Sequence, residues 1–265
     1  MLILPDCFWP KGIIDVSDCL TNDDLFISKR LRIFRVGGTI ILTAIYLHSY
    51  FELSNNYIRL IIGYNYWGLL FTTMTFISLI IVSETQANDF PRAIHKLAFI
   101  LFELSWTSEI VITIIFWVIT AIMDRVELKS YSTILHTLEC NLLPIVLLSI
   151  DFVFNKIEFI MSHGILLSII PLLYFFISLF FSLKYDVHEY SILTWKDYKT
   201  FFGIALFTFF YIMGFLSGHL LGKYKKEPTL ALADVEEKIV WPESKDLTYE
   251  PKLEDGYGTF RGYKV

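Results

Sequence analysis

Residues Gly164–Leu183 read GILLSIIPLLYFFISLFFSL, a run of 20 residues without a charged side chain. An α-helix rises 1.5 Å per residue, so about 20 such residues cross the roughly 30 Å of hydrocarbon in a bilayer. A soluble protein with one large buried core would also be rich in apolar residues. The arrangement of the remaining apolar stretches therefore decides between a membrane protein and a soluble one.

Five further stretches are mostly apolar, and short polar joints such as DRVELK at 124–129 separate them. The backbone must satisfy its own hydrogen bonds in lipid, and the ten-residue alternation typical of a barrel strand is not found in the sequence. We therefore predict an all-α integral membrane helical bundle with about six transmembrane helices. The first span is the shortest, and we expect it to extend toward the N-terminus. The six predicted spans are Val36–Phe51, Tyr64–Val82, Leu97–Met123, Ile134–Phe154, Gly164–Leu183 and Phe201–Leu221. Pro144 and Pro171 fall inside two of them and should kink their helices and free a carbonyl.

The composition agrees with this prediction and excludes one class of partner. Hydrophobic residues make up 55% of the chain and charged residues only 18%, whereas a soluble domain is about one quarter charged. The formal net charge is −5, and no basic patch stands out beyond the residues that flank the spans. We therefore expect no nucleic-acid partner.

The chain divides by composition into three predicted parts: an N-terminal interfacial segment at 1–35, a six-span bundle at 36–222, and an extended polar and aromatic tail at 223–265. The first part ends in a basic cluster of Lys29, Arg30, Arg32 and Arg35. We expect these four residues to bind lipid phosphates. The expected ligand is a bound phospholipid, cardiolipin included, and we predict no other cofactor.

The tail combines a polar composition with aromatic residues. A polar segment of this kind would be disordered by itself, and aromatic side chains are the usual anchors of protein interfaces. We therefore predict that the tail lies on partner proteins, namely other membrane-protein subunits of a large complex. The predicted anchors are Trp241, Tyr249, Tyr257, Phe260 and Tyr263.

The distribution of lysine and arginine predicts the orientation of the bundle. More of these residues fall on the side that holds both ends of the six-span bundle than on the opposite side. The positive-inside rule then places both termini in the cytosol, or in the matrix for a mitochondrial protein. We favour the mitochondrial inner membrane, with the endoplasmic reticulum or the plasma membrane as alternatives.

Ionisable residues within the predicted spans are candidates for function, because they are costly at membrane depth. His136 and Glu139 are three residues apart and share a helical face, whereas Glu103 and Glu109 are six apart and face different directions. Three interpretations are open: hydrogen bonds between helices, a catalytic or lipid-headgroup site on His136 and Glu139, and a metal or proton path. Di-iron bundles use a Glu-x-x-His pair on each of two helices, and this chain has a single pair in reversed order, so we predict no metal site. Asp151 should lie near the depth of Glu103.

Three short motifs resemble the androgen-induced and rolling-stone superfamily of multi-span membrane proteins. They are YNYWG at 64–68, FWVITA at 116–121 followed by DRVE at 124–127, and HTLECNLLP at 136–144 followed by Asp151. The likeness covers residues from about 60 to 200. Some members of that superfamily are threonine hydrolases that cleave fatty-acid esters of hydroxy fatty acids with one threonine and one histidine.

The resemblance implies a divergent member. Alignment on Trp67 and Gly68 places Asn65 where the hydrolases have their threonine. Alignment on Pro144 places Glu139 at the catalytic histidine, and His136 at a companion histidine. An amide cannot replace a hydroxyl nucleophile, and a carboxylate is a weak base unless its pKa is raised. His136, Glu139 and Asn65 thus remain the catalytic candidates.

These features predict a non-catalytic accessory subunit of a large membrane complex, with a mitochondrial respiratory or ATP synthase assembly as the first expectation. The alternative is a membrane-embedded hydrolase of fatty-acid esters that uses a hydroxyl nucleophile and His136. A transporter ranks last, because no inverted repeat or matched pair of broken spans is found in the sequence.

Overall fold

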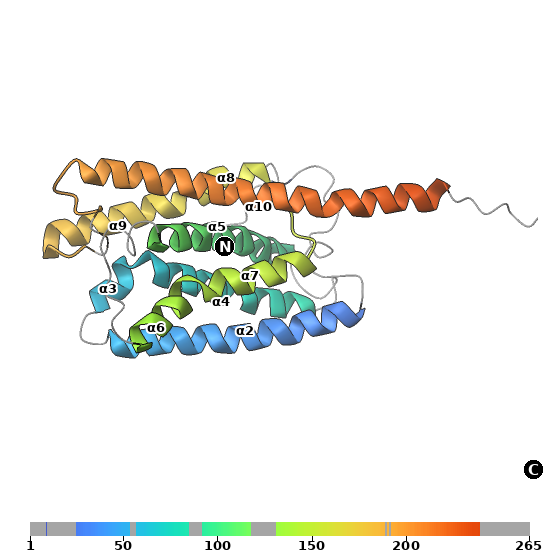
Figure 1. Ribbon diagram of the computed structural model, residues 1–265, viewed down its shortest axis with the longest axis horizontal. Coiled ribbons are helices and arrows are strands. Elements are labelled where there is room, and N and C mark those ends of the chain that lie inside the picture. Colours follow the sequence, from blue (N-terminus) through green and yellow to red (C-terminus); the bar gives the residue numbers. More distant parts are fainter. Residues whose placement is uncertain are drawn as a thin grey trace, which may run out of the picture. The chain divides into compact units, whose positions relative to one another are not determined.

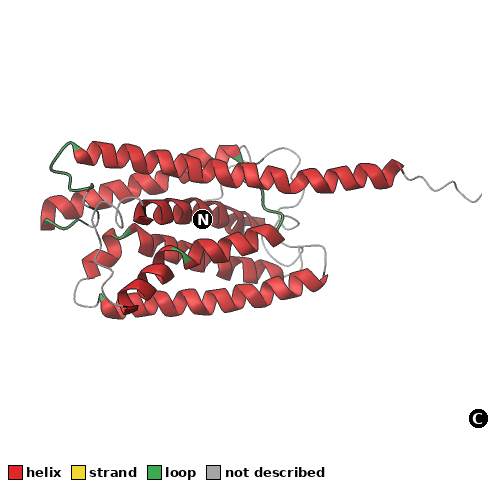
Figure 2. Ribbon diagram, viewed as in Figure 1, coloured by secondary structure: helices red, strands yellow, loops and turns green. Residues whose placement is uncertain are grey.

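The computed structural model describes residue 9 and residues 25–53, 57–84, 92–117, 131–188, 190 and 192–238, and the regular elements in these ranges are helices (Figures 1 and 2). The chain divides into two units, Met1–Lys226 and Glu227–Val265. The contacts described below lie within the first unit. In the second unit the described residues, 227–238, are helical.

The all-α fold and the membrane-spanning character are confirmed. Five helices are long and apolar enough to cross a membrane, and a bent pair gives a sixth span when it is counted as one. The span in α2 begins at Lys29, which agrees with the expected extension of the first span. The helices are α2 Leu25–Glu52, α3 Tyr57–Ile62, α4 Tyr64–Glu84, α5 Arg92–Ile115, α6 Tyr131–Asn141, α7 Leu143–Phe154, α8 Met161–Leu167, α9 Ile169–Tyr185 and α10 Lys199–Lys238.

The helices pack through small residues and aromatic rings. α4 lies against both α5 and α2, and α7 contacts α2 and α5. Gly68 allows α4 to approach α5, because a Cβ atom there would lie 2.2 Å from Cδ1 of Ile112. Near the start of α4, the rings of Tyr64, Tyr174 and Phe207 join α4, α9 and α10. Small residues at helix contacts are typical of membrane bundles, where close packing replaces the hydrophobic effect.

A bend is found next to Pro144, and a freed carbonyl is found at Pro171. α6 and α7 meet at an angle of 41° at Leu142, two residues before Pro144. The carbonyl of Asn141 at this break accepts a 2.8 Å hydrogen bond from the Thr113 hydroxyl. α8 ends at Leu167, four residues before Pro171, so the proline cannot supply the N–H that the Leu167 carbonyl would normally accept.

The predicted boundary between bundle and tail, at 222–223, falls inside a helix. α10 continues through this point to Lys238. The predicted aromatic anchors of the tail, from Trp241 to Tyr263, lie outside the described residues. Their contact with partner proteins stays a prediction.

Candidate functional site

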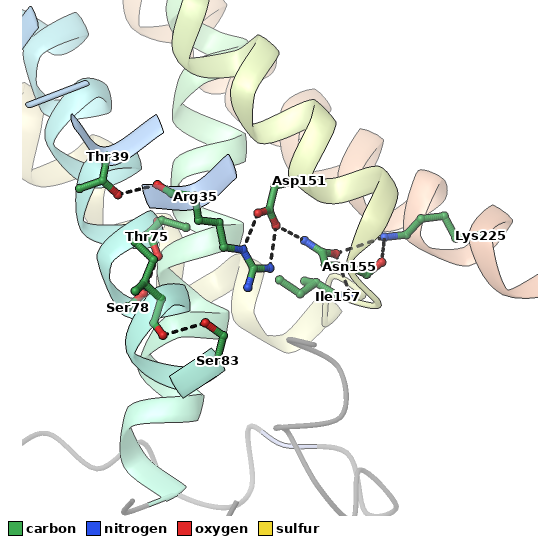
Figure 3. Close-up of polar contacts among 10 residues, drawn as sticks. Arg35, Thr39, Thr75, Ser78, Ser83, Asp151, Asn155, Ile157 and Lys225 are labelled. Carbon is green, nitrogen blue, oxygen red and sulfur yellow. Dashed lines mark hydrogen bonds and ion pairs between the residues drawn. The ribbon is translucent and has the colours of Figure 1, made fainter. Parts of the chain in front are cut away.

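A buried ion pair joins the first and fourth spans. Arg35 on α2 is only 1% exposed, and Asp151 on α7 is fully buried. The Nε atom of Arg35 lies 2.6 Å from Oδ2 of Asp151, and its Nη2 atom lies 3.1 Å from Oδ1 (Figure 3). This two-bond geometry is the strong form of the arginine–carboxylate pair. It fixes both the distance and the rotation of α2 relative to α7.

Asn155 and Lys225 extend this pair toward α10. The Asn155 amide donates a 2.8 Å hydrogen bond to Oδ1 of Asp151 (Figure 3). Lys225 donates to the carbonyls of Phe152 at 2.6 Å and Asn155 at 3.0 Å, and its Nζ lies 3.7 Å from the centre of the Phe152 ring. The last carbonyls of a helix carry partial negative charge. The negative charge of Asp151 and of the end of α7 therefore balances two cations, Arg35 and Lys225. We call Arg35, Asp151, Asn155 and Lys225 the charged cluster.

The charged cluster corrects one expectation about the basic segment. We expected Arg35 to face lipid phosphates with its neighbours, but its guanidinium lies inside the bundle because Asp151 is there to pair with it. Lys29, Arg30 and Arg32 are exposed. Lys29 and Arg32 line a surface cavity of about 360 Å³ together with Ile33 and Val36. These positions recur at helical spacing, so cations and apolar side chains meet on one face of α2.

Glu103 on α5 pairs with a histidine that the sequence did not single out. Its Oε2 atom lies 2.6 Å from Nδ1 of His163 on α8, and its Oε1 atom accepts a 2.7 Å hydrogen bond from the Ile160 N–H. The carboxylate and the imidazole are both fully buried. The ring of Trp9 packs against His163 at a centroid distance of 4.8 Å. His163 precedes the predicted fifth span by one residue, so it falls in the predicted joint between two spans.

Glu109 faces α4 instead, as the spacing of the two glutamates predicted. The Thr72 hydroxyl donates a 3.0 Å hydrogen bond to its Oε1 atom, and Oε2 has no partner among the described residues. Gly68 lies directly beside this carboxyl group. One turn earlier on α5, Ser105 and Thr75 are 2.7 Å apart across the same helix pair. These polar contacts align α4 with α5.

The catalytic candidates His136 and Glu139 lie on α6, and Asn65 lies on α4. His136 lies next to the ring of His48, with 5.4 Å between centroids, and 3.7 Å separates its Nε2 from the Cys140 sulfur. The Cys140 sulfur is also 3.7 Å from the Ser49 hydroxyl. Glu139 and Asn65 are half-buried. The described contacts do not join Asn65 to His136, and Oδ1 of Asn65 has no hydrogen-bond partner in that part of the chain.

Within the described ranges, no three His, Cys, Asp or Glu side chains are placed to hold one metal ion. Comparison of the chain with protein-family models, curated proteins and solved structures gave no match. The resemblance to the androgen-induced and rolling-stone superfamily therefore stays a prediction.

Proposed function

We propose that this multi-pass membrane protein is a non-catalytic accessory subunit of a large membrane complex and that it holds an anionic phospholipid. The observation that carries the proposal is how the buried ionisable groups are used. Arg35 pairs with Asp151, Glu103 with His163, and Glu109 with Thr72, each time between two different helices. Groups used in this way fix the pairing of helices.

The cavity at Lys29 and Arg32 supports the lipid part of the proposal. Two exposed cations can bind a phosphate, and Ile33 and Val36 offer an apolar surface to an acyl chain. Ile33 and Ile40 are 70% and 65% exposed, so the apolar surface continues along α2. Cardiolipin fits this pattern because it carries two phosphates and four acyl chains. For that reason we propose the mitochondrial inner membrane, and a respiratory or ATP synthase assembly within it.

Blue-native electrophoresis of gently solubilised membranes tests the accessory role. We expect the chain to migrate with an assembly far larger than its own 31.0 kDa. Migration only as the free protein would contradict the proposal. Subcellular fractionation separates the inner mitochondrial membrane from the endoplasmic reticulum and the plasma membrane.

A lipid-binding assay tests the cavity separately. Replacement of both Lys29 and Arg32 by alanine should reduce the cardiolipin that copurifies with the protein. Lys223→Ala is the matched control, because Lys223 is exposed and does not line this cavity. Equal retention by the double variant and the control would exclude the Lys29 cavity as the lipid site.

One observation favours a second candidate function, a membrane-embedded hydrolase of fatty-acid esters. The thiol of Cys140 lies beside the predicted base His136, and the Ser49 hydroxyl lies beside that thiol, whereas Asn65 offers no nucleophile. A histidine next to such a group can take its proton and activate it. A fluorophosphonate, which phosphonylates a nucleophile with loss of fluoride, or an acylating probe should then label the purified protein, and His136→Ala should abolish labelling while His188→Ala, in an exposed loop, should not. Absence of labelling would contradict the hydrolase function and leave the accessory role as the remaining candidate.

A further inference from the structure

Hydrogen bonds join the loop between α9 and α10 to both helices. Ser182 on α9 donates a 2.8 Å hydrogen bond to the carbonyl of Thr194, and the indole N–H of Trp195 donates to the Ser178 hydroxyl at 3.0 Å. The backbone N–H of Trp195 donates to the Thr200 hydroxyl of α10 at 2.8 Å. Thr194 and Trp195 are therefore held against both helices at this end of the bundle, which we call the loop end.

The loop end lies on the opposite side of the bundle from the charged cluster. The span in α10 runs from Lys199, next to the loop, to Lys225, which belongs to the charged cluster. A helix of 27 residues measures about 40 Å. Figure 1 shows the α9–α10 connection at one end of these helices and the start of α2 at the other.

A surface cavity of about 320 Å³ lies between this loop and the first turn of α10. Its walls carry three aromatic rings, one cation and one anion. Tyr198 is 80% exposed and Phe201 is 76% exposed, so both rings are available to a ligand. The residues that line the cavity are Trp195, Lys196, Asp197, Tyr198, Thr200 and Phe201.

The position of the cavity matches the depth of lipid headgroups. The loop carries charges, including an ion pair between Lys196 and Asp186, and the apolar span of α10 begins directly after it. Hydrogen bonding to Lys196 holds the pKa of the Asp186 carboxyl below its ordinary value, and the charge of Lys196 adds to this effect. Tryptophan and tyrosine are enriched at this level of membrane proteins.

We propose that this cavity binds the phosphocholine headgroup of a zwitterionic phospholipid. Aromatic faces attract quaternary ammonium groups, and Trp195, Tyr198 and Phe201 all line the cavity. Asp197 adds the negative charge that a trimethylammonium group requires. Lys196 binds the phosphate, because an ammonium group has three N–H donors and the pair with Asp186 does not use them all.

The chemistry of this cavity differs from that of the cavity at Lys29 and Arg32. That cavity offers two cations and two aliphatic side chains, which suits an anionic lipid. The cavity at the loop end combines aromatic rings with both signs of charge, which suits a zwitterion. The inference does not depend on the accessory role, and either can fail without the other.

Native mass spectrometry of the detergent-solubilised full chain tests the proposal. The delipidated protein is incubated with equal amounts of phosphatidylcholine, phosphatidylethanolamine and phosphatidylglycerol that share the same acyl chains, and the bound lipids are counted. We expect phosphatidylcholine to be retained severalfold more than the other two in the loop-end site. Retention of phosphatidylglycerol equal to or above that of phosphatidylcholine, lost in Lys196→Gln, would identify an anionic-lipid site and overturn the proposal.

Matched variants assign the binding to this cavity. Tyr198→Leu and Phe201→Leu keep an apolar side chain but lose the aromatic face, and each should weaken phosphatidylcholine binding by about two- to fivefold. Phe202→Leu is the control, because Phe202 is a neighbouring ring that is 61% exposed and does not line the cavity. Equal losses in Phe201→Leu and Phe202→Leu would show nonspecific lipid contact and contradict the proposal.

A separate variant, Asp197→Asn, tests the role of the negative charge on Asp197. The Asp197 side chain accepts a 3.0 Å hydrogen bond from the Lys199 N–H at the start of α10. Asparagine can keep this bond, since it is an equally good residue at a helix N-terminus. Asp197→Asn should therefore lower the binding of phosphatidylcholine without unfolding the loop. Unchanged binding of phosphatidylcholine would contradict a choline site at Asp197.

Discussion

The hydroxyl of Tyr211 on α10 donates a 2.9 Å hydrogen bond to the carbonyl of Leu167, the group that Pro171 leaves without its usual helical donor. An unpaired carbonyl in hydrocarbon costs free energy, so a side chain from another helix satisfies it. The break between α8 and α9 is therefore tied to α10.

Tyr211→Phe should lower the free energy of unfolding by about 1–2 kcal/mol, because it leaves the Leu167 carbonyl without a donor. Thermal unfolding in detergent measures the change, and Tyr198→Phe, at an exposed position, serves as the control. Pro171→Ala restores a backbone N–H four residues after Leu167. Tyr211→Phe should lower the free energy of unfolding less in a Pro171→Ala background than in the native chain. Equal losses in both backgrounds would show that the hydrogen bond to Leu167 does not cause the loss.

Arg35→Ala should lower the free energy of unfolding by about 3–5 kcal/mol, because Asp151 would stay buried without its partner. The same unfolding assay measures this, with Lys29→Ala as the exposed control. The double replacement Arg35→Met and Asp151→Leu should recover most of the loss, since it removes both charges. A double variant as unstable as Arg35→Ala would refute this account.

Gly68→Ala should weaken the contact between α4 and α5. The added Cβ atom would lie 2.2 Å from Cδ1 of Ile112 and 2.8 Å from Oε1 of Glu109, so these side chains or the helices that carry them must shift. Overpacking of this kind costs about 1–3 kcal/mol. Gly37→Ala is the matched control, because its Cβ would have no neighbour within 4 Å, and it should be neutral or slightly stabilising. Similar losses of stability in both variants would show that the close contact at Gly68 is not the cause of the loss.

The ion pair of Asp186 and Lys196 should make the loop end sensitive to acid. The pKa of Asp186 is lowered in the folded protein, so its stabilising contribution is fully present above the ordinary pKa of aspartate and is lost as the pH falls through the lowered value. Hydrogen exchange at the end of α9 measures this. The backbone amides at the end of α9 should exchange faster in Asp186→Asn than in the native protein near neutral pH. The exchange rates of the two proteins should become equal in acid. Both side chains are exposed, so the difference is small. A constant difference at every pH would exclude the ion pair as its source.

The spans could be predicted from sequence because the bilayer imposes a length and an apolar composition on each one separately. Neither property depends on which helix lies next to which. The kink at Pro144 could be predicted for the same reason, since the ring acts within its own helix.

The pairing of buried groups could not be predicted in the same way, because it depends on the rotation of each helix. Lys29, Arg30, Arg32 and Arg35 form one basic cluster in the sequence, yet Arg35 alone turns inward. A signal for this was present. Leu31, Arg35, Leu42, Ile45 and Ser49 recur at helical spacing, and all five are buried in the structure. Arg35 thus stands within the buried stripe of α2.

His163 was missed for a different reason. It lies at the start of α8, where a polar residue reads as part of a joint, and its partner Glu103 is 60 residues earlier in the chain. The position of His136 beside Cys140 follows from helical spacing, but the approach of His48 and Ser49 from α2 does not. Such contacts depend on how separate spans meet.

The separation of Arg35 and Asp151 along the chain has a consequence for biosynthesis. The two residues are 116 positions apart, and a ribosome adds roughly 5–20 residues per second. Asp151 is therefore synthesised on the order of ten seconds after Arg35. During that time the first span carries an unpaired charge at the edge of the membrane. A nascent chain that stops before Asp151 should therefore integrate its first span poorly, and glycosylation-site mapping of truncated chains would reveal this. We therefore expect completion of the fourth span, rather than emergence of the first, to commit the first span to the bilayer.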